Sequence, residues 1–188
     1  MDEATRALRA DAQRNRERIL QVAFEVFASE GLSVPVREIT RRAGVSTGTF
    51  SRHFPTKEAR FEAIVLSRAR WLGEQAARLA GSRDPGAAFF EFFDLVVEEG
   101  AANRGMAEAL AGAGYDLDSS TAREGFELTS AISELLARAQ GTGAVREDVD
   151  AADVKALITG CLARTPTPAD PAARLRMTRI AAQGLRAL

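Results

Sequence analysis

The chain has 188 residues, of which 46% are hydrophobic and 27% charged, and its formal net charge is −1. A chain of this length and composition buries a proper hydrophobic core, which excludes a disordered protein or a small scaffold held together by disulfides. No apolar run approaches the roughly 18 residues that a spanning helix needs, and the charged N-terminus is unlike a signal peptide. We therefore expect a cytoplasmic protein with no membrane partner.

Positive charge is concentrated in one part of the chain. Residues 36–60 contain 6 Arg or Lys and 2 Asp or Glu, whereas residues 61–188 contain 14 and 18. A net charge near zero does not indicate a protein that coats nucleic acid, but a local excess of basic residues is compatible with one surface that approaches it.

Few side chains are available for metal or redox chemistry. The chain has one cysteine, Cys161, and one histidine, His53. One cysteine forms no internal disulfide, and the two residues are too few for a Cys/His metal site, so we expect no metal and no cofactor. Cys161 lies among apolar residues and is interpreted as a small buried side chain, with a redox-sensing thiol as the alternative.

Apolar residues recur with helical spacing along the whole chain, which predicts an all-α protein of about nine helices. A first helix is expected over 14–30, followed by two short helices over 36–43 and 47–54. Gly44 breaks the two short helices apart, and the Ser46 hydroxyl is expected to cap the second one.

The later helices are expected to be longer on average. Thr56 is expected to cap a fourth helix that runs to about Ala80, and Asp84 with Pro85 opens a fifth helix that ends near Gly100. The remaining helices are expected at about 104–111, 120–140, 150–164 and from the segment TPTPADP to the end of the chain.

Residues 36–54 have the layout of a helix-turn-helix. Burial of Ile39, Ala43, Val45 and Phe50 is expected to hold the two short helices at a steep angle. In such a motif the second helix is held rigidly while its other face enters the major groove of DNA. That face carries small or hydrogen-bonding residues, namely Thr47, Gly48, Thr49, Ser51, Arg52 and His53.

The segment RERILQVAFEVFASEGLSVPVREITRRAGVSTGTFSRHFPTKEARFEAIV resembles the N-terminal domain of the tetracycline-repressor (TetR) family of bacterial transcriptional regulators. The similarity spans about residues 16–65. It implies a three-helix DNA-binding domain over 1–56, ordered from about residue 12, and a helical ligand-binding and dimerisation domain over 57–188. It also implies a homodimeric repressor that binds a palindromic operator in double-stranded DNA and is released by a small-molecule effector.

The resemblance assigns DNA contacts to particular residues. Lys57, at the start of the fourth helix, is expected to meet a backbone phosphate, which positions the protein without reading sequence. His53 has capping of helix contacts as an alternative role. The expected DNA-binding residues are Arg37, Ser46, Thr47, Gly48, Thr49, Ser51, Arg52, His53 and Lys57.

Three positions depart from the family pattern. Ser51 stands where a tyrosine commonly touches phosphate, Pro35 where a threonine usually opens the second helix, and Thr47 where a lysine is common. These departures predict DNA binding that depends on arginines, on Lys57 and on dimerisation. The candidate compensating charges are Arg14, Arg16, Arg18, Arg37, Arg41 and Arg42. For Arg41 and Arg42, simple solvation is the alternative.

Four phenylalanines, at positions 89, 90, 92 and 93, lie within five residues of the expected fifth helix. They point all round a helix, so they do not share one core face. Core packing and the lining of an apolar ligand pocket are the alternatives. The candidate pocket residues are Trp71, Phe89, Phe93, Met106, Tyr115 and Phe126.

The last two helices are the dimer interface that the resemblance implies. Glycines on both helices permit close approach of two backbones. The candidate interface residues are Leu157, Cys161, Ile180 and Gly184.

Together these features favour a dimeric regulator that leaves DNA when a small apolar ligand binds. The alternative is a DNA-binding dimer whose C-terminal domain binds a protein partner or only dimerises. An enzyme is not expected, because the sequence has no Ser/His/Asp set, no glycine loop that cradles phosphate and no metal-ligand set.

Overall fold

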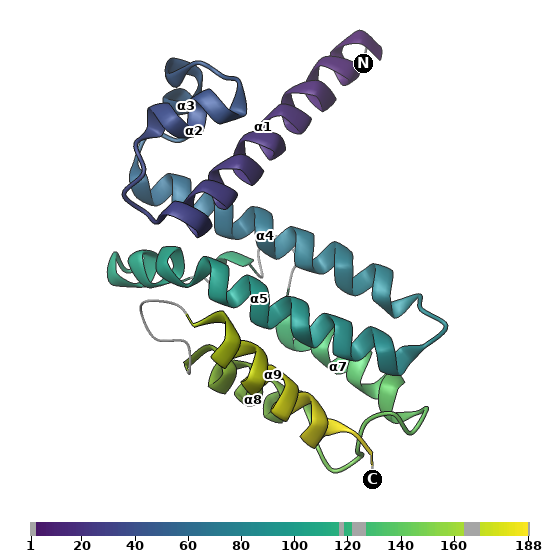
Figure 1. Ribbon diagram of the computed structural model, residues 1–188. Helices are drawn as coiled ribbons and strands as arrows, with labels where there is room; N and C mark the ends of the chain where they lie inside the picture. The colour runs from purple at the N-terminus through teal and green to yellow at the C-terminus, as the bar shows by residue number, and fades with distance from the viewer. Residues whose placement is uncertain (1–2, 117–118, 122–126, 164–169, 188) are drawn as a thin grey trace. The chain divides into compact units, whose positions relative to one another are not determined.

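The structure, a computed structural model, describes residues 3–116, 119–121, 127–163 and 170–187, with side chains described from residue 13 onward. Over these residues the fold is all-α without a β-strand, which confirms the predicted fold class. None of the described helices is long and apolar enough to cross a membrane. The helices are α1 (Glu3–Glu30), α2 (Val36–Ala43), α3 (Thr47–His53), α4 (Lys57–Ala80), α5 (Pro85–Gly112), α7 (Leu128–Gln140), α8 (Ala151–Ala163) and α9 (Pro171–Leu185) (Figure 1).

The chain divides into two compact units. Unit 1 comprises residues 1–68 and 103–117, and unit 2 comprises residues 69–102 and 118–188. Helices α4 and α5 therefore contribute residues to both units. The sequence predicts a different division, into a DNA-binding domain that ends at Thr56 and a ligand-binding domain that follows it. The two compact units do not test that functional division, which stays a prediction.

Unit 1 is built on the apolar face of α1. The buried residues of this face include Ile19, Leu20, Ala23, Phe24 and Phe27. Phe27 meets Phe61 of α4 edge to face, with ring centroids 5.4 Å apart. From α5, Met106 and Leu110 are also buried. The first turns of α4 and the last turns of α5 therefore share the unit that contains the helix-turn-helix.

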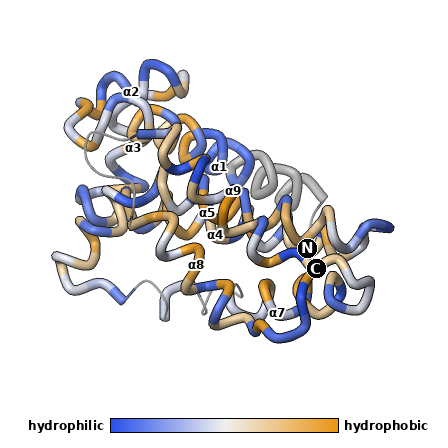
Figure 2. Tube along the Cα trace, turned by 60° about the horizontal axis from the view of Figure 1, so that its bottom comes forward, coloured by the Kyte–Doolittle hydropathy of each residue, from blue (hydrophilic) through white to orange (hydrophobic). Residues whose placement is uncertain are grey.

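Unit 2 has a separate core. Helix α7 packs on α8, and α8 packs on α9. Hydrophobic and hydrophilic residues alternate along these helices, as the orange and blue segments in Figure 2 show. The buried residues of α7, including Ile132 and Leu135, join the phenylalanines of α5 in one cluster.

The helix ends follow local sequence signals. Ser46, Thr56, Asp84 and Asp150 each accept a backbone N–H hydrogen bond from the first turn of the helix that follows, at 2.8–3.1 Å. Gly44 ends α2 with a φ of 64°, a left-handed conformation in which a β-carbon is strained. The caps predicted at Ser46, Thr56 and Asp84 and the break predicted at Gly44 are confirmed.

The predicted break between a fifth and a sixth helix is wrong, because α5 is continuous from Pro85 to Gly112. Gly100, expected to end the fifth helix, lies inside α5. A β-carbon at this position would be 2.8 Å from Leu162 Cδ1 of α8. The glycine therefore permits close helix packing and does not end the helix.

Two helix starts also differ from the prediction. Helix α1 begins at Glu3 and not near Arg14, because the residues before Arg14 are good helix formers. These residues lack an apolar periodicity, so the periodicity alone does not predict this part of the helix. Helix α7 begins at Leu128, after an extended Glu127, and not near residue 120, although residues 119–121 are helical as well. Phe126, a candidate pocket residue, lies outside the described residues.

Candidate nucleic-acid interface

Helices α2 and α3 form the helix-turn-helix predicted over residues 36–54. Helix α2 packs against both α1 and α3. It buries Ile39, Thr40 and Ala43, and α3 buries Phe50. Val45 in the turn, predicted to be buried, is half-buried. The motif is therefore anchored through one apolar face of each short helix.

Hydroxyl groups join the turn to the start of α3. Ser46 Oγ accepts a 3.1 Å hydrogen bond from the backbone N–H of Thr49 and lies 2.8 Å from Thr49 Oγ1. Thr47 Oγ1 lies 3.3 Å from Thr40 Oγ1 on α2. The first turn of α3 is thus held in place before any DNA is bound, which lowers the cost of ordering it on binding.

The outer face of α3 is small and polar. Thr47, Gly48, Arg52 and His53 are exposed, whereas Thr49 and Ser51 are half-buried. A β-carbon at position 48 would meet no atom within 4 Å. Arg52 Nε donates a 3.2 Å hydrogen bond to the carbonyl of residue 48. Position 48 therefore leaves room for a base pair to approach this face closely.

Two cations flank α3 without an acidic partner in the described part of the chain. Arg37 of α2 and Lys57 of α4 are exposed. Lys57 Nζ lies 5.3 Å from the centroid of the Phe61 ring, a contact that orients the side chain but leaves its charge uncompensated. Both residues remain available for phosphate.

Arg41 and Arg42 are exposed and are also ion-paired, so solvation is accompanied by acidic partners. Glu38 Oε2 accepts a 2.9 Å hydrogen bond from Arg41 Nε, and Glu38 Oε1 accepts bonds from Arg41 Nη2 at 2.6 Å and Arg42 Nε at 2.7 Å. Arg42 Nη1 also donates to Glu30 at the end of α1. These guanidinium groups lower the pKa of Glu38 to about 2. In the sequence, only the spacings of three and four residues point to this pairing.

The candidate pocket residues fall in different places. Phe89 and Phe93 are buried in the core cluster of unit 2, and Trp71 is a partly buried side chain packed against that cluster. Met106 is buried in unit 1, and Tyr115 is exposed. The structure thus brings only the α4 and α5 members of unit 2 into one cluster.

The candidate interface residues are mostly at the surface of unit 2. Leu157 of α8 is 38% exposed and Ile180 of α9 is 61% exposed, and Gly184 is exposed as well. Sequence reasoning missed Leu175, which is 59% exposed and stands between two arginines of α9.

Cys161 differs from the other candidate interface residues because the chain itself covers it. It is 1% exposed and belongs to the core of unit 2, which agrees with its interpretation as a buried apolar residue. Burial raises the pKa of its thiol, although a hydrogen bond with Thr178 acts in the opposite direction. A protonated thiol is a poor nucleophile, so the redox alternative gains no support.

Comparison with known proteins identifies both parts of the chain. Residues 19–64 match the sequence model described as "Bacterial regulatory proteins, tetR family". Residues 84–187 match the model described as "Transcriptional regulator SbtR-like, C-terminal domain". The first match contains α2 and α3, and the second contains α5 to α9.

Solved structures resemble the chain over nearly its whole length. The crystal structure of a TetR transcription regulatory protein from Mycobacterium vanbaalenii is 42% identical, and the match covers 95% of this chain and 99% of that one with a TM-score of 0.75. The TetR transcriptional regulator SCO0520 from Streptomyces coelicolor is 29% identical, with 92% and 98% covered and a TM-score of 0.76.

Curated relatives match over shorter stretches. The HTH-type transcriptional regulator UidR of Escherichia coli (strain K12) is 35% identical over 92 residues, which is 48% of this chain and 43% of UidR. The chain therefore spans less than half the length of that relative. The HTH-type transcriptional repressor KstR of Mycobacterium tuberculosis is 31% identical over 149 residues, which is 75% of this chain and 66% of KstR.

These relatives are transcriptional regulators and not enzymes. The rigid, polar α3, the all-helical fold and the two family matches agree with one another. The chain belongs to the TetR family of bacterial transcriptional regulators.

Proposed function

We propose that this regulator is a homodimeric repressor that binds a palindromic operator through α3 and leaves it when a small apolar ligand binds to unit 2. The single observation that carries the DNA-binding part is the exposed polar face of α3, whose first turn is held by Ser46 and by the Thr40–Thr47 contact. A helix of this kind fits the major groove with its N-terminal residues toward the bases.

Within this proposal the DNA contacts divide into two classes. Thr47, Thr49 and Arg52 read base edges, because their hydroxyl and guanidinium groups match the donors and acceptors of the major groove. Arg37 and Lys57 meet phosphates and set the register of the protein on the duplex. Gly48 and Ser51 permit close approach, and His53 either meets phosphate or packs beside Phe54, at a ring-centroid distance of 6.1 Å.

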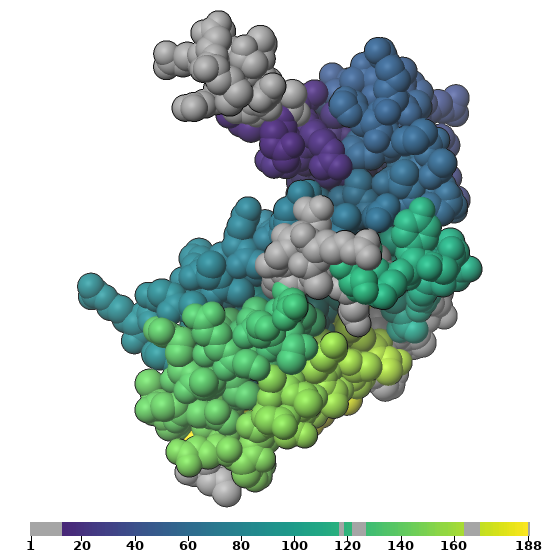
Figure 3. Space-filling model, turned by 180° about the vertical axis from the view of Figure 1, so that it is seen from behind, coloured from purple at the N-terminus to yellow at the C-terminus, as the bar shows by residue number. Residues whose placement is uncertain are grey.

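The dimer part of the proposal depends on the apolar surface of the last two helices. Leu157, Leu175 and Ile180 are large apolar side chains exposed on α8 and α9. The face of unit 2 formed by α7 and α8 is coloured green to yellow-green in Figure 3. A second copy of the chain would cover these side chains, and a two-fold dimer places two recognition helices roughly 34–36 Å apart on a palindrome.

The ligand part depends on α4. This helix begins in unit 1 with Lys57, and its last turns, including Leu72 and Ala76, belong to the core cluster of unit 2 with the phenylalanines of α5. A ligand that prefers one arrangement of unit 2 weakens DNA binding by its difference in affinity between the two arrangements. The chemistry of this core favours a small apolar ligand.

One observation favours the second candidate, a DNA-binding dimer whose unit 2 only dimerises or binds a protein. Phe89, Phe92 and Phe93 are each 2% exposed, so the chain's own side chains already surround them. A ligand would then have to displace packed side chains.

Two measurements test the proposal. A thermal-shift screen with hydrophobic metabolites and antibiotics should raise the melting temperature for a pocket ligand, because a ligand bound only to the folded state stabilises that state. The same compound should lower the affinity for operator DNA in a fluorescence anisotropy titration. Operator binding without any ligand response would favour the dimerisation-only candidate, and absence of specific DNA binding would reject both.

A further inference from the structure

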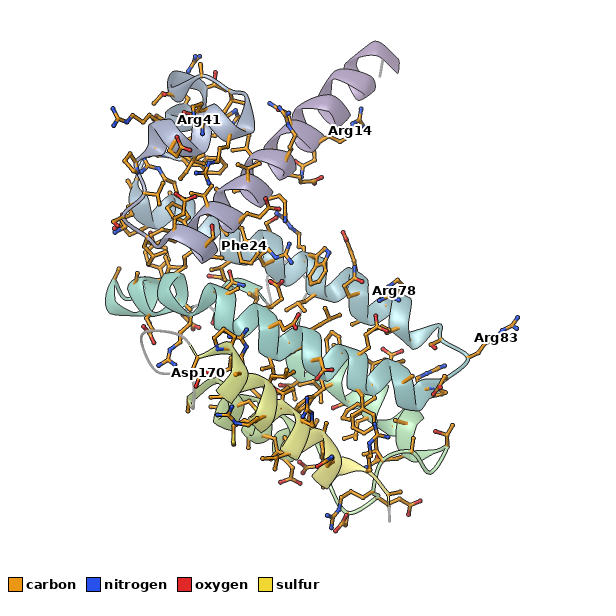
Figure 4. All side chains as sticks on the ribbon, in the orientation of Figure 1. Arg14, Phe24, Arg41, Arg78, Arg83 and Asp170 are labelled. Carbon is orange, nitrogen blue, oxygen red and sulfur yellow. The ribbon has the colours of Figure 1, made fainter. Side chains whose placement is uncertain are left out.

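The two exposed arginines on the outer side of α2 are in different electrostatic states. Arg37 and Arg41 are four residues apart on one helix and so lie on the same side of it. Arg37 has no ion-pair partner within the described residues, whereas Arg41 is held by Glu38 through both Nε and Nη2. Figure 4 labels Arg41 on α2 in unit 1. The same side of α2 therefore presents one arginine without an acidic partner in the described residues, Arg37, and one that is paired with Glu38, Arg41.

Arg41 differs from its neighbour Arg42. The side chain of Arg42 is 37% exposed and joins Glu38 to Glu30, so it links α2 to the end of α1. The side chain of Arg41 is 69% exposed, and its ion pair among the described residues is with Glu38. Arg42 therefore contributes to the packing of unit 1, and Arg41 has the freedom to reach outward once Glu38 is removed.

We propose that Glu38 withholds Arg41 from the DNA backbone and thereby limits the strength of operator binding. This inference rests on the proposed function, because it concerns the same DNA-binding surface. Glu38 is a positioning residue in this account, since it acts on DNA affinity only through the arginine that it holds.

The charges of the cluster explain why phosphate does not displace Glu38. Glu30, Glu38, Arg41 and Arg42 together carry no net charge. If Arg41 left for a phosphate, two carboxylates would share one guanidinium, and a net negative charge would stay beside the negatively charged duplex. The paired state is therefore favoured next to DNA.

The test is the salt dependence of operator affinity in four full-length proteins, namely the unmodified chain, Glu38→Gln, Arg41→Ala and the double variant. Each phosphate that gains a cation steepens the slope of log K against log[salt] by about 0.9. We expect Glu38→Gln to steepen the slope by that amount per protomer. We expect Arg41→Ala alone to leave the slope unchanged. In the double variant the steeper slope caused by Glu38→Gln should disappear, because the released arginine is absent.

The affinity gain of Glu38→Gln should also depend on salt. One additional phosphate per protomer makes two per dimer, so the gain in operator affinity should shrink by about 12-fold between 50 and 200 mM salt, or about 3.5-fold for each phosphate. The matched control is Glu58→Gln on α4, which removes a carboxylate that has no ion-pair partner in the described part of the chain. This control removes a negative charge near the DNA and so should raise affinity. It releases no arginine, so combining it with Arg41→Ala should not change the salt slope.

Three outcomes would overturn the inference. An unchanged slope in Glu38→Gln, a shallower slope in Arg41→Ala alone, or an equal gain in the double variant would each show that Arg41 is not withheld. Failure of the proposed function gives a different result from failure of this inference. In that case neither the unmodified chain nor any variant would bind an operator, and no salt slope could be measured. Thermal denaturation of each variant verifies that it is folded.

Discussion

The guanidinium of Arg68 on α4 lies 4.6 Å from the centroid of the Phe24 ring on α1, and its Nη1 donates a 2.9 Å hydrogen bond to Gln21 Oε1. Arg68 is buried although it carries a charge. Phe24 is labelled on α1 in Figure 4. Because the ring face is electronegative, it stabilises a desolvated guanidinium. Arg68 thus ties the first half of α4 to α1 inside unit 1.

Replacing Arg68 by alanine should lower the free energy of unfolding by about 2–3 kcal/mol, since the cation–π contact, the hydrogen bond and the packing of the side-chain stem are lost together. Urea denaturation measures the change. The control is Arg78→Ala, which breaks a surface pair with Glu91 at 2.6 Å and should cost at most about 1 kcal/mol. Equal losses in the two variants would contradict the role of Arg68.

Two substitutions of Ser46, the cap of α3, should have different effects on stability and on DNA binding. Ser46→Ala should lower the free energy of unfolding by about 1 kcal/mol, because the Thr49 N–H loses its acceptor. Ser46→Asp should keep the stability, since aspartate also caps, yet weaken operator binding by placing a negative charge beside phosphate. Asp170→Ala, which removes the cap of α9, should cost similar stability with DNA affinity intact. Denaturation and anisotropy titrations together check this, and normal DNA binding by the Ser46→Asp variant would refute it.

Lys57 should act on DNA without reading sequence. Lys57→Ala is expected to weaken binding to specific and unrelated DNA alike and to make the salt slope shallower by about 0.9 per protomer. Lys57→Arg should restore most of the slope, because the charge is retained. Titrations at several salt concentrations measure both effects. A loss confined to the specific operator would assign Lys57 to base reading.

Local signals account for much of what could be predicted from the sequence. Gly44 marks the end of α2 and Ser46 the start of α3, because a left-handed φ and a side-chain cap both act within a few residues. The polar face of α3 follows from the same periodicity that buries Phe50. Such features need no knowledge of the rest of the fold.

Long-range contacts explain what could not be predicted. The continuity of α5 through Gly100 depends on Leu162, which lies far along the chain. The pairing of Arg42 with Glu30 and the contact of Arg68 with Phe24 likewise join different helices. The sequence around Leu175 does not tell whether this leucine is buried or exposed. Its exposure follows from how α9 packs in unit 2.

Dimerisation should depend on the exposed leucine and isoleucine side chains of the last two helices. Ile180→Arg introduces a charge where the proposed interface is apolar, so the protein should sediment as a monomer at concentrations at which the unmodified chain is a dimer. Operator binding should fall with it, while the thermal stability of unit 2 changes little because Ile180 is largely exposed. A variant that remains dimeric would place the interface elsewhere.

Acid should weaken the Glu38 cluster over a defined range. The folded chain holds the pKa of Glu38 at about 2, below the ordinary value of 4.5, because Arg41 and Arg42 donate hydrogen bonds to it. A lowered pKa contributes stability above the ordinary value, and this contribution is lost as the pH falls from about 4.5 to about 2. Urea midpoints should therefore fall more steeply over this range in the unmodified chain than in Glu38→Gln. Identical pH profiles would show that the pairing does not stabilise the folded chain.

The central claim, that α3 reads a palindromic operator, is tested most directly by sequencing the genomic fragments that the purified protein selects, in parallel with Thr49→Ala. We predict a palindrome whose half-sites lie about one helical turn or a multiple of it apart. We further predict that the alanine variant prefers altered bases at the same positions in both half-sites. Selection of no common motif by the unmodified protein, or of an unchanged motif by the variant with equal losses on all sequences, would contradict the claim.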